Sequence, residues 1–122
     1  MFVVMSGIEM THATIRAIAL ALPEAEEHPH FDRASFRVRG KIFATLPPAK
    51  DGRELVVLKL PPLVKESLRQ TDAGAIVSLG GWDKGGWTQL DIGRIDGDKL
   101  ADLVRLAWRV VAPKTLIAGE GA

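Results

Sequence analysis

The chain has 122 residues, 47% of them hydrophobic and 25% charged, and its formal net charge is +1. This length suits one domain with one core, and the charge alone predicts no tight non-specific binding to nucleic acid. The absence of cysteine excludes disulfides, thiolate catalysis and cysteine-ligated zinc or iron–sulfur sites.

Both ends are predicted to lie outside the folded domain. The first five residues, Met1-Phe2-Val3-Val4-Met5, are apolar but lack the basic region and cleavage site of a signal peptide. We expect residues 1–10 to be disordered, residues 11–116 to form a single domain, and residues 117–122 to form a C-terminal tail. No apolar run is long enough to span a membrane, so we expect a cytoplasmic protein.

A helix is predicted to begin at His12, where Thr11 can act as its N-cap, and to end at Pro23. Its buried stripe consists of apolar residues at helical spacing: Ile15, Ile18, Ala19 and Leu22. The charged segment from Glu24 to Asp32 that follows is predicted to be a polar connection.

Residues 35–46 are predicted to form a β-hairpin, with Gly40-Lys41 as a two-residue type II′ turn. That turn would pair Val38 with Phe43 and Arg37 with Ala44. One face would then carry Phe36, Val38, Phe43 and Thr45, and the other Arg37, Arg39, Ile42 and Ala44.

The remaining elements are predicted from hydrophobic runs and proline or glycine boundaries. They are a central strand over 54–60, a helix from Pro61-Pro62 to about Gln70, strands over 76–79 and 87–92, and a helix over 97–112 capped by Asp96. The order α-β-β-β-α-β-β-α predicts an α+β fold. Its sheet would be mostly antiparallel, with about five strands and helices packed on one face.

The predicted hairpin is rich in basic residues. Arg37 and Arg39 would share a strand face and Lys41 would lie at the tip, so the hairpin could contact phosphates. The alternative is a solvated strand face whose charges prevent edge-to-edge aggregation.

The segment Gly80-Gly81-Trp82-Asp83-Lys84-Gly85-Gly86-Trp87 places two indoles and a lysine among four glycines. Trp82, Lys84 and Trp87 could stack on a base, a ring or a peptide. Alternatively, the indoles cover the sheet edge and the glycines serve turns.

His28, His30 and Asp32 alternate along the chain and are weak candidates for a metal site, but a polar loop is the favoured explanation because a fourth ligand is missing. Neither a nucleophile elbow nor a Walker-type loop occurs in the sequence. We therefore predict no enzymatic activity and no cofactor.

As a whole, residues 12–116 resemble the MmcQ/YjbR family. The matching segments are Leu22-Pro23-Glu24, residues 36–44, Leu58-Lys59-Leu60, Lys84 and Trp87 before a strand, and residues 103–114. The resemblance implies a CyaY-like, frataxin-related double-wing fold and a DNA-binding function. The family's loop often reads Asn-Lys-x-His-Trp, whereas this chain has Asp83 and Gly86 in place of the asparagine and the histidine.

These observations favour a small DNA-binding protein that contacts phosphates weakly and in a salt-sensitive manner. Arg37, Arg39 and Lys41 would act from one wing, and Lys84 with Trp87 from the other. One alternative is a protein–protein adaptor anchored by Trp82 and Trp87. Another is a small-molecule site that uses Lys84, His28 and His30 as polar groups.

Overall fold

The computed structural model describes residues 9–82 and 84–120, and of Trp82 and Glu120 it describes the backbone alone. The expected disorder of residues 1–10 therefore concerns mainly residues outside the described part of the chain. Among the described helices, none combines the length and the apolar character that crossing a membrane requires.

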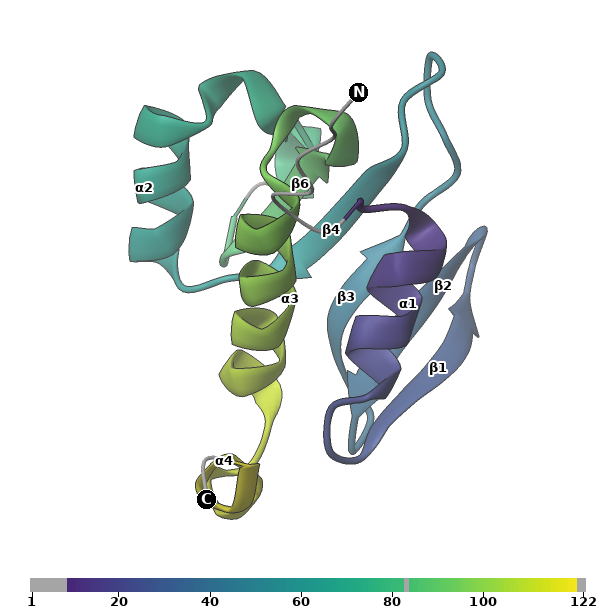
Figure 1. The fold of residues 1–122 in the computed structure, drawn as a ribbon, viewed down its shortest axis with the longest axis vertical. Helices are drawn as coiled ribbons and strands as arrows, with labels where there is room; N and C mark the ends of the chain where they lie inside the picture. The colour runs from purple at the N-terminus through teal and green to yellow at the C-terminus, as the bar shows by residue number, and fades with distance from the viewer. Residues whose placement is uncertain (1–8, 83, 121–122) are drawn as a thin grey trace, which may run out of the picture.

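The described elements form an α+β fold, as predicted (Figure 1). In chain order they are α1 (His12–Leu20), β1 (Ala25–His30), β2 (Arg33–Val38), β3 (Lys41–Leu46), β4 (Leu55–Lys59), α2 (Pro62–Thr71), β5 (Ile76–Val77), β6 (Trp87–Asp91), α3 (Gly97–Val111) and α4 (Lys114–Glu120). Short 3₁₀ turns occupy Ala73–Ala75, Gly80–Trp82 and Ile92–Arg94. The strands form one six-stranded sheet in the order β1-β2-β3-β4-β6-β5, and every neighbouring pair is antiparallel.

The prediction of a polar connection from Glu24 to Asp32 is wrong, because most of this segment is the edge strand β1. It pairs with β2 over six residue pairs, from Ala25 opposite Val38 to His30 opposite Arg33. An edge strand needs few apolar residues and tolerates proline, so Pro29 and the charged composition do not prevent pairing.

The β2–β3 hairpin forms as predicted, but its register and turn differ. Arg39 and Gly40, with φ of +50° and +83°, form the turn, and Lys41 already pairs with Val38 in the strands. Positive φ at both central residues is the pattern of a type I′ turn, which suits the twist of a hairpin.

Next to the turn the register therefore differs from the predicted one by two residues, and a bulge between Phe36 and Arg37 then shifts it back by one. Phe36 therefore lies opposite Ala44, Arg37 lies opposite Ile42, and Phe43 is the extra residue of β3. Ala44 is consequently buried on the core face and not, as predicted, beside Arg37.

The C-terminal tail predicted from residue 117 is also incorrect, because α4 continues through Ile117. Pro113 ends α3 but also lies just before α4, a position where proline is well tolerated. Leu116 and Ile117 pack against the core, which explains why this last helix forms.

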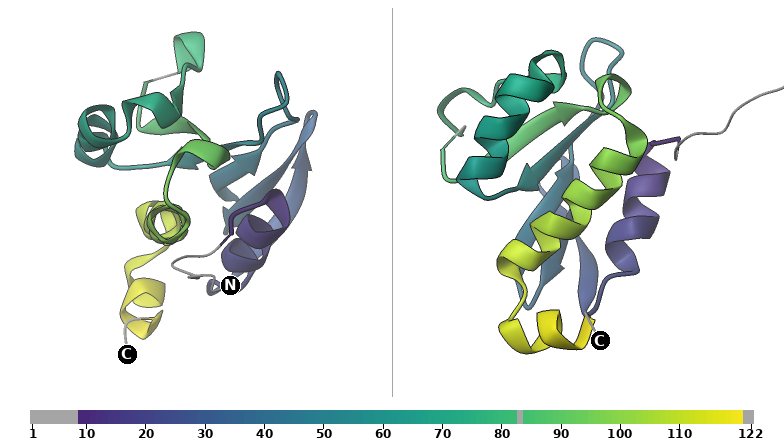
Figure 2. Two further views of the ribbon diagram at one scale, coloured as in Figure 1. Left: turned by 45° about the horizontal axis from the view of Figure 1, so that its top comes forward. Right: turned by 60° about the vertical axis from the view of Figure 1, so that its left-hand side comes forward.

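The helices build one core on one face of the sheet (Figure 2). α1 and α3 lie side by side, with α3 across β3 and β4, and α2 contributes Leu68 to the same core. The predicted N-caps are confirmed: Thr11 Oγ1 accepts a hydrogen bond from the Thr14 amide at 3.1 Å, and Asp96 Oδ2 from the Lys99 amide at 3.0 Å. The largest fully buried side chain is Trp108.

The sheet consists of two three-stranded halves joined by a short seam. β3 and β4 share only the pairs Ala44–Leu58 and Thr45–Val57, whereas β4 and β6 pair over five positions. The first half is β1-β2-β3 and the second is β4-β6-β5. α3 contacts both sides of the seam through β3 and β4, and therefore supports it.

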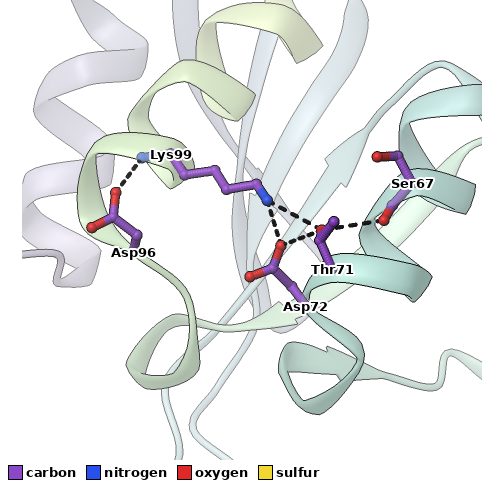
Figure 3. Close-up of polar contacts among 5 residues, drawn as sticks. All are labelled: Ser67, Thr71, Asp72, Asp96 and Lys99. Carbon is purple, nitrogen blue, oxygen red and sulfur yellow. Dashed lines mark hydrogen bonds and ion pairs between the residues drawn. The ribbon is translucent and has the colours of Figure 1, made fainter.

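A polar cluster joins α2 to α3 at the helix side of the second half (Figure 3). The Lys99 ammonium reaches across from α3 and donates to the Asp72 carboxylate and to Thr71 Oγ1. The single Thr71 hydroxyl proton lies within reach of two acceptors, Asp72 Oδ2 at 2.7 Å and the Ser67 carbonyl at 3.2 Å. The hydrogen bond from Lys99 holds the pKa of Asp72 below its ordinary value of 3.8, and the hydrogen bond from Thr71 lowers it further.

We expect Asp72→Asn to destabilise the protein by about 0.5–1 kcal/mol near neutral pH, because the pair is partly screened by solvent. A lowered carboxyl pKa stabilises the fold above the unfolded pKa, so this loss should vanish as the pH falls below about 4. Urea unfolding at several pH values measures it. In a Lys99→Met background the same substitution should cost little, and an equal cost in both backgrounds would contradict the assignment.

Candidate functional site

The face of the sheet opposite the core is named here the open face. Its central row crosses all six strands through the aligned residues His28, Ser35, Thr45, Val57, Gln89 and Val77. Within residues 9–82 and 84–120, α1, α2 and α3 all contribute to the core on the other side. The core contacts of these helices therefore lie on the other face. On the open face Ser35, Thr45, Val57 and Gln89 of the central row are nevertheless buried, and Arg37, Lys59 and Trp87 are partly exposed.

Arg37 lies on the open face, half-buried, and is held by polar contacts without a carboxylate. Its Nε donates to Ser35 Oγ at 3.0 Å, and its Nη2 donates to His30 Nδ1 at 3.5 Å. Ser35, fully buried, donates in turn to the His28 carbonyl at 2.9 Å. The side chain is therefore oriented, and its guanidinium retains N–H donors for a ligand.

The structure does not place Arg39 beside Arg37. Arg39 belongs to the β2–β3 turn, and its Nε and Nη2 donate to the two carboxylate oxygens of Glu24 at 3.0 and 3.2 Å. This bidentate contact lowers the pKa of Glu24 from its ordinary value of 4.5. Arg39 thus has a carboxylate partner at the surface. Lys41, predicted to lie in the turn, instead begins β3 and is exposed.

Trp87 opens β6 on the open face, as the alternation predicted, and lies opposite Lys59. The Lys59 ammonium sits 4.8 Å from the centre of the indole, a cation–π contact. Lys65, a buried lysine of α2, donates to the Trp87 carbonyl at 2.7 Å and fixes the start of the strand. Trp87 as a whole is half-buried, and the Lys59 ammonium lies over one face of its ring.

The glycine before Trp87 has a structural reason. Gly86 has φ of +87°, its carbonyl accepts from the Leu60 amide at 2.9 Å, and a Cβ there would lie 2.1 Å from the Leu60 carbonyl oxygen. No side chain fits this backbone conformation, so the structure requires glycine at this position. Lys84, two residues earlier, is exposed, and the side chain of Trp82 lies outside the described part of the structure.

The weak metal candidates are engaged in other contacts. His28 Nε2 donates to Glu26 at 3.0 Å, His30 contacts Arg37, and Arg33 donates to Asp32 at 2.9 Å. The Arg33 contact lowers the pKa of Asp32 from its ordinary value of 3.8. Over the described residues, His, Asp and Glu side chains form no cluster of three that could hold a metal ion.

A second polar group lies at the other end of β6. The buried carboxylate of Asp91 accepts from the Gly93 amide at 3.0 Å and has Arg53 and Arg94 at 3.8 and 3.6 Å. These residues line an open hollow of about 400 Å³. Glu54 also lines the hollow, so its two arginines face two carboxylates, Asp91 and Glu54. The hollow is therefore no strong anion site.

Sequence reasoning missed Lys59 and Ser35 as parts of this surface. Lys59 is the one charged residue in the hydrophobic run 55–60. The sequence pattern therefore singles out Lys59 but does not indicate that Trp87 is its partner. Only the pairing of β4 with β6 places it against Trp87. The contact between Ser35 and Arg37 was not predicted, because it depends on β1, which was not expected. The His28 carbonyl of β1 accepts the hydrogen bond that orients the Ser35 hydroxyl.

A protein-family model described as YjbR matches residues 20–110. The chain belongs to the YjbR family. The matched region runs from the end of α1 through all six strands and most of α3. The resemblance found in the sequence is thereby confirmed.

The fold agrees with a solved relative. The crystal structure of Deinococcus radiodurans protein DR2400, which carries a DUF419 domain, superimposes with a TM-score of 0.76 at 23% identity. The match covers 88% of this chain and 82% of that one. No curated protein matches the chain. At this identity the likeness establishes the fold alone.

Gly86→Ala should destabilise the protein by about 3 kcal/mol or more, because the new Cβ would clash with the Leu60 carbonyl and the residue would keep a positive φ. Gly85 is the matched control, since it has φ of +69° but open space around a Cβ. Gly85→Ala should cost about 1 kcal/mol. Equal costs in thermal or urea unfolding would show that the close approach at Gly86 is unimportant.

Proposed function

We propose that this YjbR-family protein binds nucleic acid through the open face, at the end of the sheet where β4 finishes and β6 begins. Arg37, Lys41, Lys59 and Lys84 supply the phosphate contacts, and Trp87 supplies a stacking surface. The observation that carries the proposal is that Ser35 and His30 orient Arg37, while among the described residues its cross-strand neighbour Glu26 contacts His28 at 3.0 Å and forms no ion pair with Arg37.

The geometry of the sheet supports cooperation between its two halves. Arg37 and Trp87 point to the same face, with β3 and β4 between their strands. Three inter-strand spacings of about 4.8 Å separate the strands by roughly 14 Å. Each strand of duplex DNA carries a phosphate about every 3.4 Å of helix axis, so a span of this length laid along the axis passes about four phosphates of one strand.

The proposed binding is weak and depends on salt. The cations are few, Arg39 is paired with Glu24, and the net charge of the chain is +1. About four phosphate contacts correspond to a slope of about −3.6 in a plot of log affinity against log salt concentration.

Arg37→Ala should weaken binding and make the salt slope shallower by about one unit, because one phosphate contact is lost. Fluorescence anisotropy with labelled DNA at several salt concentrations measures both. Arg105→Ala is the matched control: Arg105 lies on α3, on the helix side of the molecule, paired with Asp102 at 3.1 Å. It should leave affinity and slope unchanged.

The unchanged protein must bind DNA at tens of micromolar in low salt for the proposal to stand. Equal effects of Arg37→Ala and Arg105→Ala would indicate attraction by overall charge and would remove the open face as the site.

Glu24→Gln should strengthen binding, because it removes the carboxylate that neutralises Arg39. The salt slope should steepen by up to about one unit if the released guanidinium reaches a phosphate. In the double variant Glu24→Gln with Arg39→Ala the gain should disappear. A gain that persists there would mean that general charge, and not Arg39, is responsible.

A protein partner is the alternative, and one observation favours it: Leu63, near the end of β4, is 85% exposed. Binding to a protein through Leu63 and Trp87 would be insensitive to salt and would survive nuclease treatment of a cell extract. Loss of such binding in Leu63→Ser and Trp87→Ala would support the adaptor.

A further inference from the structure

The tip of the β1–β2 hairpin presents an unusual aromatic residue. Phe31 is 96% exposed and has φ of +58°. A bulky residue other than glycine rarely adopts a positive φ, and doing so costs about 1–3 kcal/mol. Full exposure means that burial of the ring does not offset that cost. Glycine, asparagine or aspartate would suit this turn better, so the fold does not explain the phenylalanine.

Contacts connect Phe31 to the proposed nucleic-acid surface. The Phe31 ring meets the His30 ring edge-on, with centroids 4.7 Å apart. His30 Nδ1 in turn accepts from Arg37 Nη2 at 3.5 Å. An exposed ring, an imidazole and an oriented guanidinium thus follow one another along the surface.

The charge around the tip also suits an anionic chain. The one acidic residue of the turn, Asp32, is paired with Arg33 at 2.9 Å, so its repulsion of a phosphate is reduced. An apolar ligand of Phe31, such as a membrane surface or a protein pocket, would have no use for the neighbouring Arg37 guanidinium. A planar base carrying a phosphate matches both the ring and the cation.

We infer that Phe31 stacks on an unpaired base of a single-stranded nucleic acid whose phosphate contacts Arg37. The inference rests on the proposed function and gives it a preference for single strands. In duplex DNA the bases are already stacked on one another, so a duplex offers the ring no exposed base face without unstacking.

The test compares a labelled oligothymidine with the same oligonucleotide annealed to its complement. Phe31→Gly should lower affinity for the single strand about 5- to 100-fold, leave the duplex within about twofold, and leave the salt slope unchanged. Phe31→Trp, which keeps a stacking ring, should bind the single strand at least as well as the unchanged protein. Glycine favours the positive φ, so the melting temperature of Phe31→Gly should stay equal or rise.

Several results would overturn the inference. Unchanged single-strand binding in Phe31→Gly, alongside weaker binding in Arg37→Ala, would refute the stacking role and leave the proposed function intact. An equal loss for single strand and duplex would refute the preference for single strands. A change from dimer to monomer in Phe31→Gly would show that the ring contacts a second copy. Absence of DNA binding by the unchanged protein would remove both proposals.

Discussion

The arrangement of this domain depends on the indole of Trp108. The side chain is completely buried, and its Nε1 donates to the Pro23 carbonyl at 2.9 Å, across 85 positions of sequence. This contact fixes α3 against the turn that leads from α1 into β1. Truncating a buried tryptophan typically costs about 3–5 kcal/mol, a large share of the stability of a small domain. Both helices and the first half of the sheet are therefore held together at this residue.

Because the helices pack on one face of the sheet, the other face is the one on which the proposed site lies. The core takes up the apolar residues of that face, and the other face holds Arg37, Lys59 and Trp87. The charges are also sorted: Arg39 has a carboxylate partner, whereas Arg37 has a hydroxyl and an imidazole. Among the described residues Arg37 has no ion pair, although Glu26 lies opposite it on β1, so in the proposed site it is the arginine with the most donors left for a phosphate.

Much of this fold could be predicted from the sequence. The caps Thr11 and Asp96, the hydrophobic run of β4 and the alternation of β6 are local signals, and each gave the correct element. β1 could not be recognised, because an edge strand is stabilised by pairing with β2 and not by its own composition. The hairpin register failed because Arg39 adopts a positive φ that side chains usually avoid. Partners such as Glu24 and Lys59 depend on contacts between distant segments, which no local pattern specifies.

The short seam between β3 and β4 has a further consequence for recognition. With only two residue pairs across it, main-chain hydrogen bonds constrain the angle between the halves weakly. That angle is set instead by how α3 packs across both strands. The spacing between Arg37 in the first half and Trp87 in the second half thus depends on the packing of the hydrophobic core. In the proposed site, repacking the core beneath the seam would therefore change the distance between Arg37 and Trp87 without substituting either residue.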